Sequence, residues 1–130
     1  MLMKFRNLAS IALVSILLFS SCSDYSKVVK STDYEFKYKK ALEYYEGGEF
    51  VRSSTLLKDL IAIVRGTSRA DKVYYYYAKS QFGLKDYMMA GHYFKSLIKE
   101  FPRSEFAAES QFMVGYCFYL DSPSVRLDQQ

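Results

Sequence analysis

The strongest constraint on the fold of this chain is an internal repeat, because three stretches superimpose when the sequence is shifted by 37 residues. Small and aromatic residues fall in register at Ala41, Ala78 and Gly115; at Tyr38, Tyr75 and Phe112; and at Tyr45, Phe82 and Tyr119. A repeat of this length is typical of a stacked helical solenoid, in which each unit buries its apolar face against its neighbours. Solenoids present extended binding surfaces, so the repeat favours a scaffold or a peptide binder.

Apolar periodicity and helix-ending residues predict an all-α fold. Asp33 is suited to cap the first helix, and Gly47-Gly48 to end it, because glycine readily adopts the left-handed turn after a helix. Pro102 ends the fourth helix, since proline cannot continue the hydrogen-bond ladder, and we expect Ser104 to cap the fifth. The predicted helices cover about residues 33–46, 49–64, 69–82, 86–100 and 104–120.

The N-terminus has the pattern of a secretory signal peptide, with Lys4 and Arg6 before an apolar run from Leu8 to Phe19. This run is well short of the roughly 20 residues that span a bilayer. Residues 19–22, Phe-Ser-Ser-Cys, resemble the lipobox of bacterial lipoproteins. The resemblance implies that Cys22 is acylated and begins the mature protein. An ordinary signal peptide with a chance cysteine is the alternative.

This resemblance divides the chain into a signal peptide (1–21), a lipidated cysteine with a polar tether (22–32), the repeats (33–121) and a tail (122–130). Lipoproteins of this kind resemble proteins with multiply acylated anchors, for example with palmitate, so we expect membrane attachment through one leaflet. Asp24 resembles the inner-membrane retention signal of enterobacterial lipoproteins. The sequence therefore leaves inner or outer membrane sorting open.

Charge and side-chain chemistry argue against several function classes. Loss of Lys4 and Arg6 with the signal peptide leaves 16 of the 18 basic residues against 14 acidic ones, too weak an excess for nucleic acid. No base stands at a spacing that would serve Cys117, and His92 is the single histidine. Metal-ligand clusters and phosphate-binding glycine loops are absent from the sequence. We expect a non-catalytic protein without cofactor or metal, in which Cys117 is a packing residue without a disulfide partner.

The second repeat resembles a tetratricopeptide repeat, whose large–small–aromatic–Ala–Phe–Pro pattern is matched at Tyr74, Ala78, Tyr87, Ala90, Phe94 and Pro102. The first repeat is looser, since Lys37 and Lys40 stand where the family prefers large apolar groups and Ser53 replaces its alanine. The third repeat has only its first helix. The resemblance thus implies about two and a half repeats, and we expect the chain to be the front portion of a longer protein.

In tetratricopeptide folds the first helix of each hairpin lines the concave surface. The positions carried over from the family are Glu35, Tyr38, Leu42 and Tyr45; Lys72, Tyr75, Lys79 and Phe82; and Glu109, Phe112, Tyr116 and Tyr119. An aromatic surface with cationic points suits an extended peptide with aromatic side chains and a carboxylate. Packing is the alternative role for each of these rings. Among the four consecutive tyrosines 74–77, we expect Tyr75 to line the groove.

The combination of lipobox, tether and long-period hairpins resembles the outer-membrane protein assembly lipoprotein family BamD (YfiO). Residues 25–33 (YSKVVKSTD) and 101–107 (FPRSEFA) are similar to its Bacteroidetes-type members. The resemblance implies a periplasm-facing outer-membrane lipoprotein that binds the barrel assembly subunit, other assembly lipoproteins and unfolded β-barrel precursors. A glycan-binding nutrient lipoprotein and a cell-envelope scaffold are the alternatives.

Overall fold

The computed structural model describes residues 24–122, so the predicted signal peptide, Cys22 and residues 123–130 lie outside the described residues. The described chain is all-helical, with a helix over 24–30 followed by α2 (Tyr34–Glu46), α3 (Phe50–Val64), α4 (Ala70–Gly83), α5 (Tyr87–Glu100) and α6 (Ala107–Asp121). Each predicted helix is confirmed within three residues at either end. No described helix has the length and apolar character needed to cross a bilayer.

Within the described residues, the chain divides into two compact parts, which meet in the sequence between Lys37 and Tyr38. In the first part, residues 24–30 are helical, where the sequence predicted only a polar tether. Lys37 stabilises the C-terminal end of this helix, because the Nζ of the buried lysine donates a 2.9 Å hydrogen bond to the carbonyl of Val29. A lysine side chain that reaches the C-terminus of a helix satisfies a carbonyl that has no partner within that helix. This contact accounts for a lysine where the tetratricopeptide pattern has an apolar residue.

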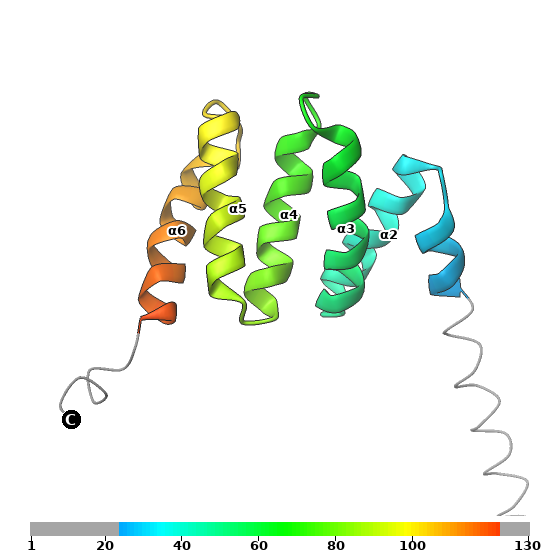
Figure 1. Ribbon diagram of the computed structural model, residues 1–130, viewed down its shortest axis with the longest axis horizontal. Coiled ribbons are helices and arrows are strands. Elements are labelled where there is room, and N and C mark those ends of the chain that lie inside the picture. The colour runs from blue at the N-terminus through cyan, green and yellow to red at the C-terminus, as the bar shows by residue number, and fades with distance from the viewer. Residues whose placement is uncertain (1–23, 123–130) are drawn as a thin grey trace, which may run out of the picture. The chain divides into compact units, whose positions relative to one another are not determined.

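The second part is a helical hairpin solenoid, in which each helix packs on the next: α3 on α4, α4 on α5 and α5 on α6. Figure 1 shows these four helices side by side in chain order. The core between them consists of one apolar stripe from each helix. Its most deeply buried large side chains are Phe94, Leu56, Leu57, Leu60 and Leu97. The repeat positions Ala41 and Ala78 are also fully buried.

Local signals in the sequence set the helix ends. The Asp33 carboxylate accepts a hydrogen bond from the Phe36 N–H, and that of Asp86 accepts one from the Met89 N–H, so both are N-caps. Gly48 takes a positive φ of 75° after α2, as expected. The prediction that Ser104 caps α6 is wrong, because the helix begins later, with Phe106 at the N-cap position.

Gly83 ends α4 for a reason that the sequence does not reveal. A Cβ at this position would lie 2.5 Å from Cδ2 of Phe50, at the start of α3. The left-handed residue in the following turn is Lys85, with a φ of 64°. Gly83 therefore makes room for an aromatic ring of the preceding helix and is not the turn residue itself.

Candidate peptide-binding surface

The most exposed aromatic side chains of the repeats lie on α6. Phe112, Tyr116 and Tyr119 are 69 %, 40 % and 75 % exposed, and we call them the aromatic ridge. Their rings stack in sequence, with centroids 6.0 Å apart between Phe112 and Tyr116 and 6.4 Å apart between Tyr116 and Tyr119. The spacing of three and four residues places them along one side of the helix. The three predicted third-repeat aromatic residues are therefore brought together and accessible.

Phe82 of α4 extends this ridge. Its ring centroid lies 5.7 Å from that of Tyr116 and 5.3 Å from that of Tyr87. The Phe82 side chain is half-buried, so it supports the ring of Tyr116 from below and contributes little accessible surface of its own. Aromatic faces of this kind offer large apolar contact with little side-chain entropy to lose. The ridge can thus bind an apolar or aromatic segment of another molecule.

Tyr75 is a packing residue, contrary to the expectation that it lines a groove. Its side chain is only 7 % exposed, and its ring stacks on that of Phe106 with centroids 4.4 Å apart. Among the four consecutive tyrosines, Tyr76 alone is half-buried, while Tyr74 and Tyr77 are buried against Tyr93 of α5. Three of the four tyrosines therefore hold neighbouring helices together.

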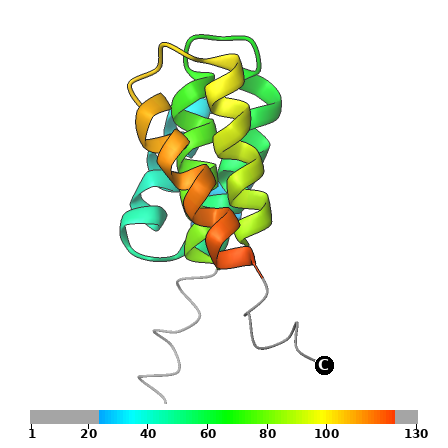
Figure 2. The ribbon, with the colours of Figure 1, turned by 90° about the vertical axis from the view of Figure 1, so that its left-hand side faces the viewer.

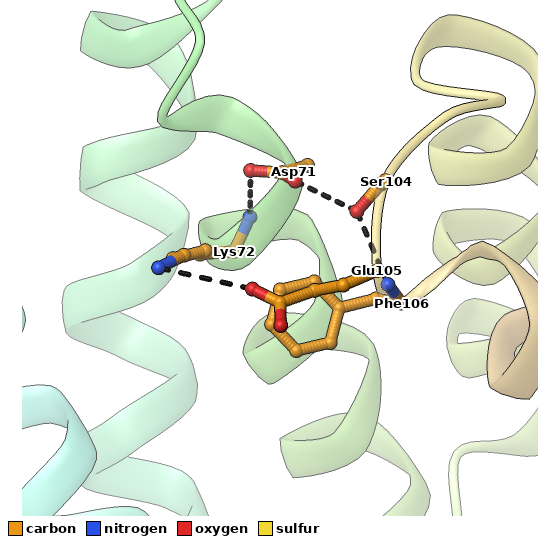
Figure 3. Close-up of polar contacts among 5 residues, drawn as sticks. All are labelled: Asp71, Lys72, Ser104, Glu105 and Phe106. Atoms are coloured by element: carbon orange, nitrogen blue, oxygen red, sulfur yellow. Dashed lines mark hydrogen bonds and ion pairs between the residues drawn. The ribbon is translucent and has the colours of Figure 1, made fainter.

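The loop between α5 and α6 fixes the start of α4, as Figure 3 shows. Ser104 donates a 2.7 Å hydrogen bond to Oδ2 of Asp71, and it accepts one of 3.2 Å from the Phe106 N–H. The predicted groove residue Lys72 is exposed, and its Nζ lies 3.9 Å from Oε1 of Glu105. The loop therefore presents Phe106 to Tyr75 and an acidic partner to Lys72.

Lys79, the second predicted cationic point, is also paired. Its Nζ lies 3.0 Å from Oε1 of Glu109 on α6 and 5.8 Å from the ring centroid of Tyr75. The hydrogen bond that Tyr75 donates, together with Lys79, lowers the pKa of the Glu109 carboxyl. Burial and that same hydrogen bond raise the pKa of Tyr75. These contacts join α4 to α6 and leave the surface closer to neutral than the sequence predicted.

The predicted first-repeat residues lie on α2. Tyr38, Leu42 and Tyr45 are all half-buried. Burial, with smaller contributions from Tyr76 and Asp71, raises the pKa of Tyr38 to about 12. The Tyr45 ring meets that of Tyr76 edge-on, with centroids 5.4 Å apart. These positions therefore contribute to helix packing, and only their outer edges are accessible.

The acidic partners Glu105 and Glu109 were not identified as ion-pairing residues from the sequence. The repeat places Glu35, Lys72 and Glu109 at equivalent positions, a charge alternation that indicates contacts between units, but the pairs observed are Lys72 with Glu105 and Lys79 with Glu109. Phe106 gave no such signal, since its role depends on the path of the loop.

A cavity of about 230 Å³ lies between α5 and α6, lined by Tyr87, Met88, Gly91, Cys117 and Phe118, with His92, Lys95 and Asp121 completing the wall. Cys117 is buried, as predicted, and burial raises the pKa of its thiol. A raised pKa keeps the thiol protonated near neutral pH and lowers its reactivity. Within residues 24–122 no group of three His, Cys, Asp or Glu side chains is placed to hold a metal ion.

The sequence was compared with protein-family models and with curated proteins, and no match was found in either comparison.

Proposed function

We propose that this protein is a non-catalytic, lipid-anchored component of the machinery that assembles outer-membrane β-barrel proteins. In this role it binds unfolded barrel precursors along the aromatic ridge, and it binds the barrel assembly subunit and other assembly lipoproteins through its repeats. The lipid on Cys22 holds it at the periplasmic side of the outer membrane. The proposal combines the lipobox resemblance with the surface that the repeats expose.

The observation that carries the peptide-binding part is the accessible stack of Phe112, Tyr116 and Tyr119. The cation of Lys79 is paired with Glu109, which precedes Phe112 by three residues on α6. Interface hot spots are rich in aromatic residues, because these bury large areas while fixing few rotatable bonds. An extended segment with aromatic side chains and a terminal carboxylate matches this combination. Lys79 would then exchange part of its contact with Glu109 for the carboxylate of the peptide.

Binding of a labelled peptide that ends in a free-carboxylate phenylalanine tests the proposal, with an alanine-ended and an amidated peptide as controls. We expect the aromatic, free-acid peptide to bind best, and Tyr119→Ala to weaken it about tenfold, the effect of losing one well-buried contact. Phe118→Ala is the matched protein control, because Phe118 is 64 % exposed but lies outside the ridge. Equal binding of all three peptides would refute the role of the ridge.

The membrane role has a separate test. A lipid-anchored version should co-purify with a large outer-membrane barrel protein, and Cys22→Ser should release it from the membrane fraction. Depletion is expected to lower outer-membrane porin levels. A division defect with normal porin levels would instead favour the cell-envelope scaffold, and measurable oligosaccharide binding would favour the glycan-binding lipoprotein.

A further inference from the structure

One end of the solenoid carries an excess of exposed basic side chains. The α3–α4 and α5–α6 loops lie together at this end, as Figure 1 and Figure 2 both show. The exposed basic residues of these loops and of the helix turns beside them form what we call the basic end: Arg65, Arg69, Lys99 and Arg103. Because the helices of a solenoid pack side against side, the loops at their ends stay open to solvent.

A hydrogen bond between neighbouring repeats holds the two loops together. Ser104 of the α5–α6 loop donates it, over 2.7 Å, to Asp71 in the first turn of α4 (Figure 3). Arg103 directly precedes Ser104, and Arg69 lies two residues before Asp71. The basic end is therefore one surface, built from two repeats.

Much of the positive charge at this end is not neutralised by the described chain. Arg65, Lys99 and Arg103 form no ion pair with a carboxylate of residues 24–122. The basic residues here, with Lys72 added to the four of the basic end, are five. The acidic residues at this end are Asp71, Glu100 and Glu105. Since Glu105 already faces Lys72, the basic end keeps an excess of positive charge.

The opposite end of the solenoid has the reverse charge. It contains the α2–α3 and α4–α5 turns and the C-terminus of α6. The acidic residues there are Glu46, Glu49, Asp86 and Asp121, and the basic ones are Arg52 and Lys85. An anionic surface would therefore attract the basic end and repel the opposite one.

The tether from the predicted lipid anchor joins the repeats at the basic end. Burial, Tyr76 and Asp71 of the first turn of α4 together raise the pKa of Tyr38 on α2. The N-terminal part of α2 therefore lies beside the α3–α4 loop. Cys22 precedes Tyr34, the first residue of α2, by twelve residues. These residues span at most about 40 Å, so an acylated Cys22 leaves the basic end within reach of the bilayer surface.

We propose that the basic end binds the anionic phospholipid headgroups of the leaflet that holds the Cys22 lipid. Guanidinium and ammonium groups pair with phosphate, and basic residues close to an anionic membrane are attracted to it. Ile63, 43 % exposed in the last turn of α3, adds an apolar side chain to this surface. The acyl chains supply the attachment, and the basic end sets the orientation of the solenoid. The inference rests on the proposed function only for the lipid on Cys22.

Vesicle binding tests this inference. The mature chain (22–130) with Cys22→Ser, which has no acylation site, is sedimented with vesicles of phosphatidylcholine alone or of an equal mixture with phosphatidylglycerol. At physiological ionic strength we expect binding to the anionic vesicles only, and added salt should weaken it. Arg103→Gln should weaken binding about fivefold, equivalent to about 1 kcal/mol, and Arg65→Gln combined with Arg103→Gln about 25-fold.

Lys85→Asn is the matched control, because it removes one exposed cation from a loop at the opposite end. Asparagine tolerates the positive φ of 64° at this position. The length of α5 separates Lys85 from the basic end by about 20 Å, well beyond the Debye length of about 8 Å. Lys85→Asn should therefore change the affinity less than about twofold, and thermal melts should show that every variant is folded.

A fluorescent label shows which end meets the bilayer. An environment-sensitive dye is attached to Ile63→Cys at the basic end or to Met88→Cys at the opposite end, both exposed positions, while Cys117 is buried. We expect anionic vesicles to shift the emission of the dye at residue 63 to the blue and to leave that at residue 88 unchanged.

Several results would overturn the inference. They are equal shifts of the two dyes, an affinity that Arg65→Gln with Arg103→Gln leaves unchanged, and an equal loss with Lys85→Asn. Binding of polyglutamate but not of vesicles, weakened by Arg103→Gln, would instead assign the basic end to an acidic protein. A Cys22 without lipid in cells, with vesicle binding intact, would refute the proposed anchor and support the basic end.

Discussion

Two glycine-to-alanine substitutions test the packing of the solenoid, because the structure predicts opposite results for them. Both glycines lie on helices, and replacing a helical glycine by alanine stabilises a protein by about 0.5–1 kcal/mol when nothing else changes. At Gly115 nothing lies within 4 Å of the added methyl, so Gly115→Ala should give this stabilisation. At Gly83 the methyl would stand 2.5–2.7 Å from three ring atoms of Phe50.

The magnitude at Gly83 follows from that distance. Carbon atoms in contact lie about 3.5–4.0 Å apart, so the Phe50 ring or the start of α3 must move by about 1 Å. Overpacking of this kind destabilises by about 1–3 kcal/mol, which exceeds the helix-propensity gain at a position that ends α4. The Phe50 ring also contacts Tyr45, with centroids 5.8 Å apart, which limits its freedom to move away. We expect Gly83→Ala to destabilise by about 1–2 kcal/mol.

The assay is urea unfolding of the purified protein, followed by far-ultraviolet circular dichroism, with a thermal melt alongside it. For a domain of this size, 1 kcal/mol corresponds to about 4–8 °C in Tm. Gly83→Ala should therefore melt lower and Gly115→Ala higher than the parent protein. In a Phe50→Leu background, Gly83→Ala should be less damaging, because the clashing ring is gone, with a coupling of about 0.5–3 kcal/mol. Stabilisation by both substitutions, or zero coupling, would refute the packing of α3 on α4.

Three other predictions concern polar groups. The buried Ser80 hydroxyl donates a hydrogen bond to the Tyr76 carbonyl and lies 3.1 Å from the Ser53 hydroxyl. Ser80→Ala leaves the Ser53 hydroxyl without this partner, so it should destabilise the protein by about 1–3 kcal/mol. In urea unfolding this loss should exceed that of Ser53→Ala. Ser110 has a buried hydroxyl with no hydrogen-bond partner, so Ser110→Ala should be neutral or stabilising by up to about 1 kcal/mol, and a clear loss in Tm would contradict this. The lowered pKa of Glu109 means that its contribution is present above the usual carboxyl pKa of about 4.3 and is lost as the pH falls through its folded value. Because the pair is partly exposed to solvent, Glu109→Gln should remove only about 0.2–1 kcal/mol at neutral pH, and the difference from the parent should vanish in acid.

The helices of this chain could be predicted from the sequence because their ends depend on local chemistry. Asp33, Gly48 and Pro102 act within a few residues of their own position, through a side-chain cap, a positive φ and a missing N–H group. The helix over 24–30 was missed because its stabilising contact is with Lys37, which a local pattern does not reveal. Ser104 was misassigned because its hydroxyl serves Asp71 of another helix.

The candidate site was harder to predict, because periodicity identifies a face of a helix but not the neighbour that covers it. Four consecutive tyrosines necessarily point in several directions, and the sequence alone favoured Tyr75. The structure buries that ring under Phe106, a residue thirty-one positions later whose location depends on the loop before α6. The Lys79–Glu109 pair was missed for a similar reason, because it joins two repeats that are adjacent in space.

Equivalent positions of the repeat have different roles in α4 and α6 because their neighbours differ. Tyr75 is buried by the loop and helix that follow it, whereas its counterpart Phe112 is 69 % exposed. Covering one phenylalanine side chain stabilises a complex by about 1.5–3 kcal/mol, while association itself costs at least about 4 kcal/mol. No single ring on α6 can therefore hold a partner. Phe112, Tyr116 and Tyr119 must act together, so binding at the ridge depends on contacts made at several residues at once.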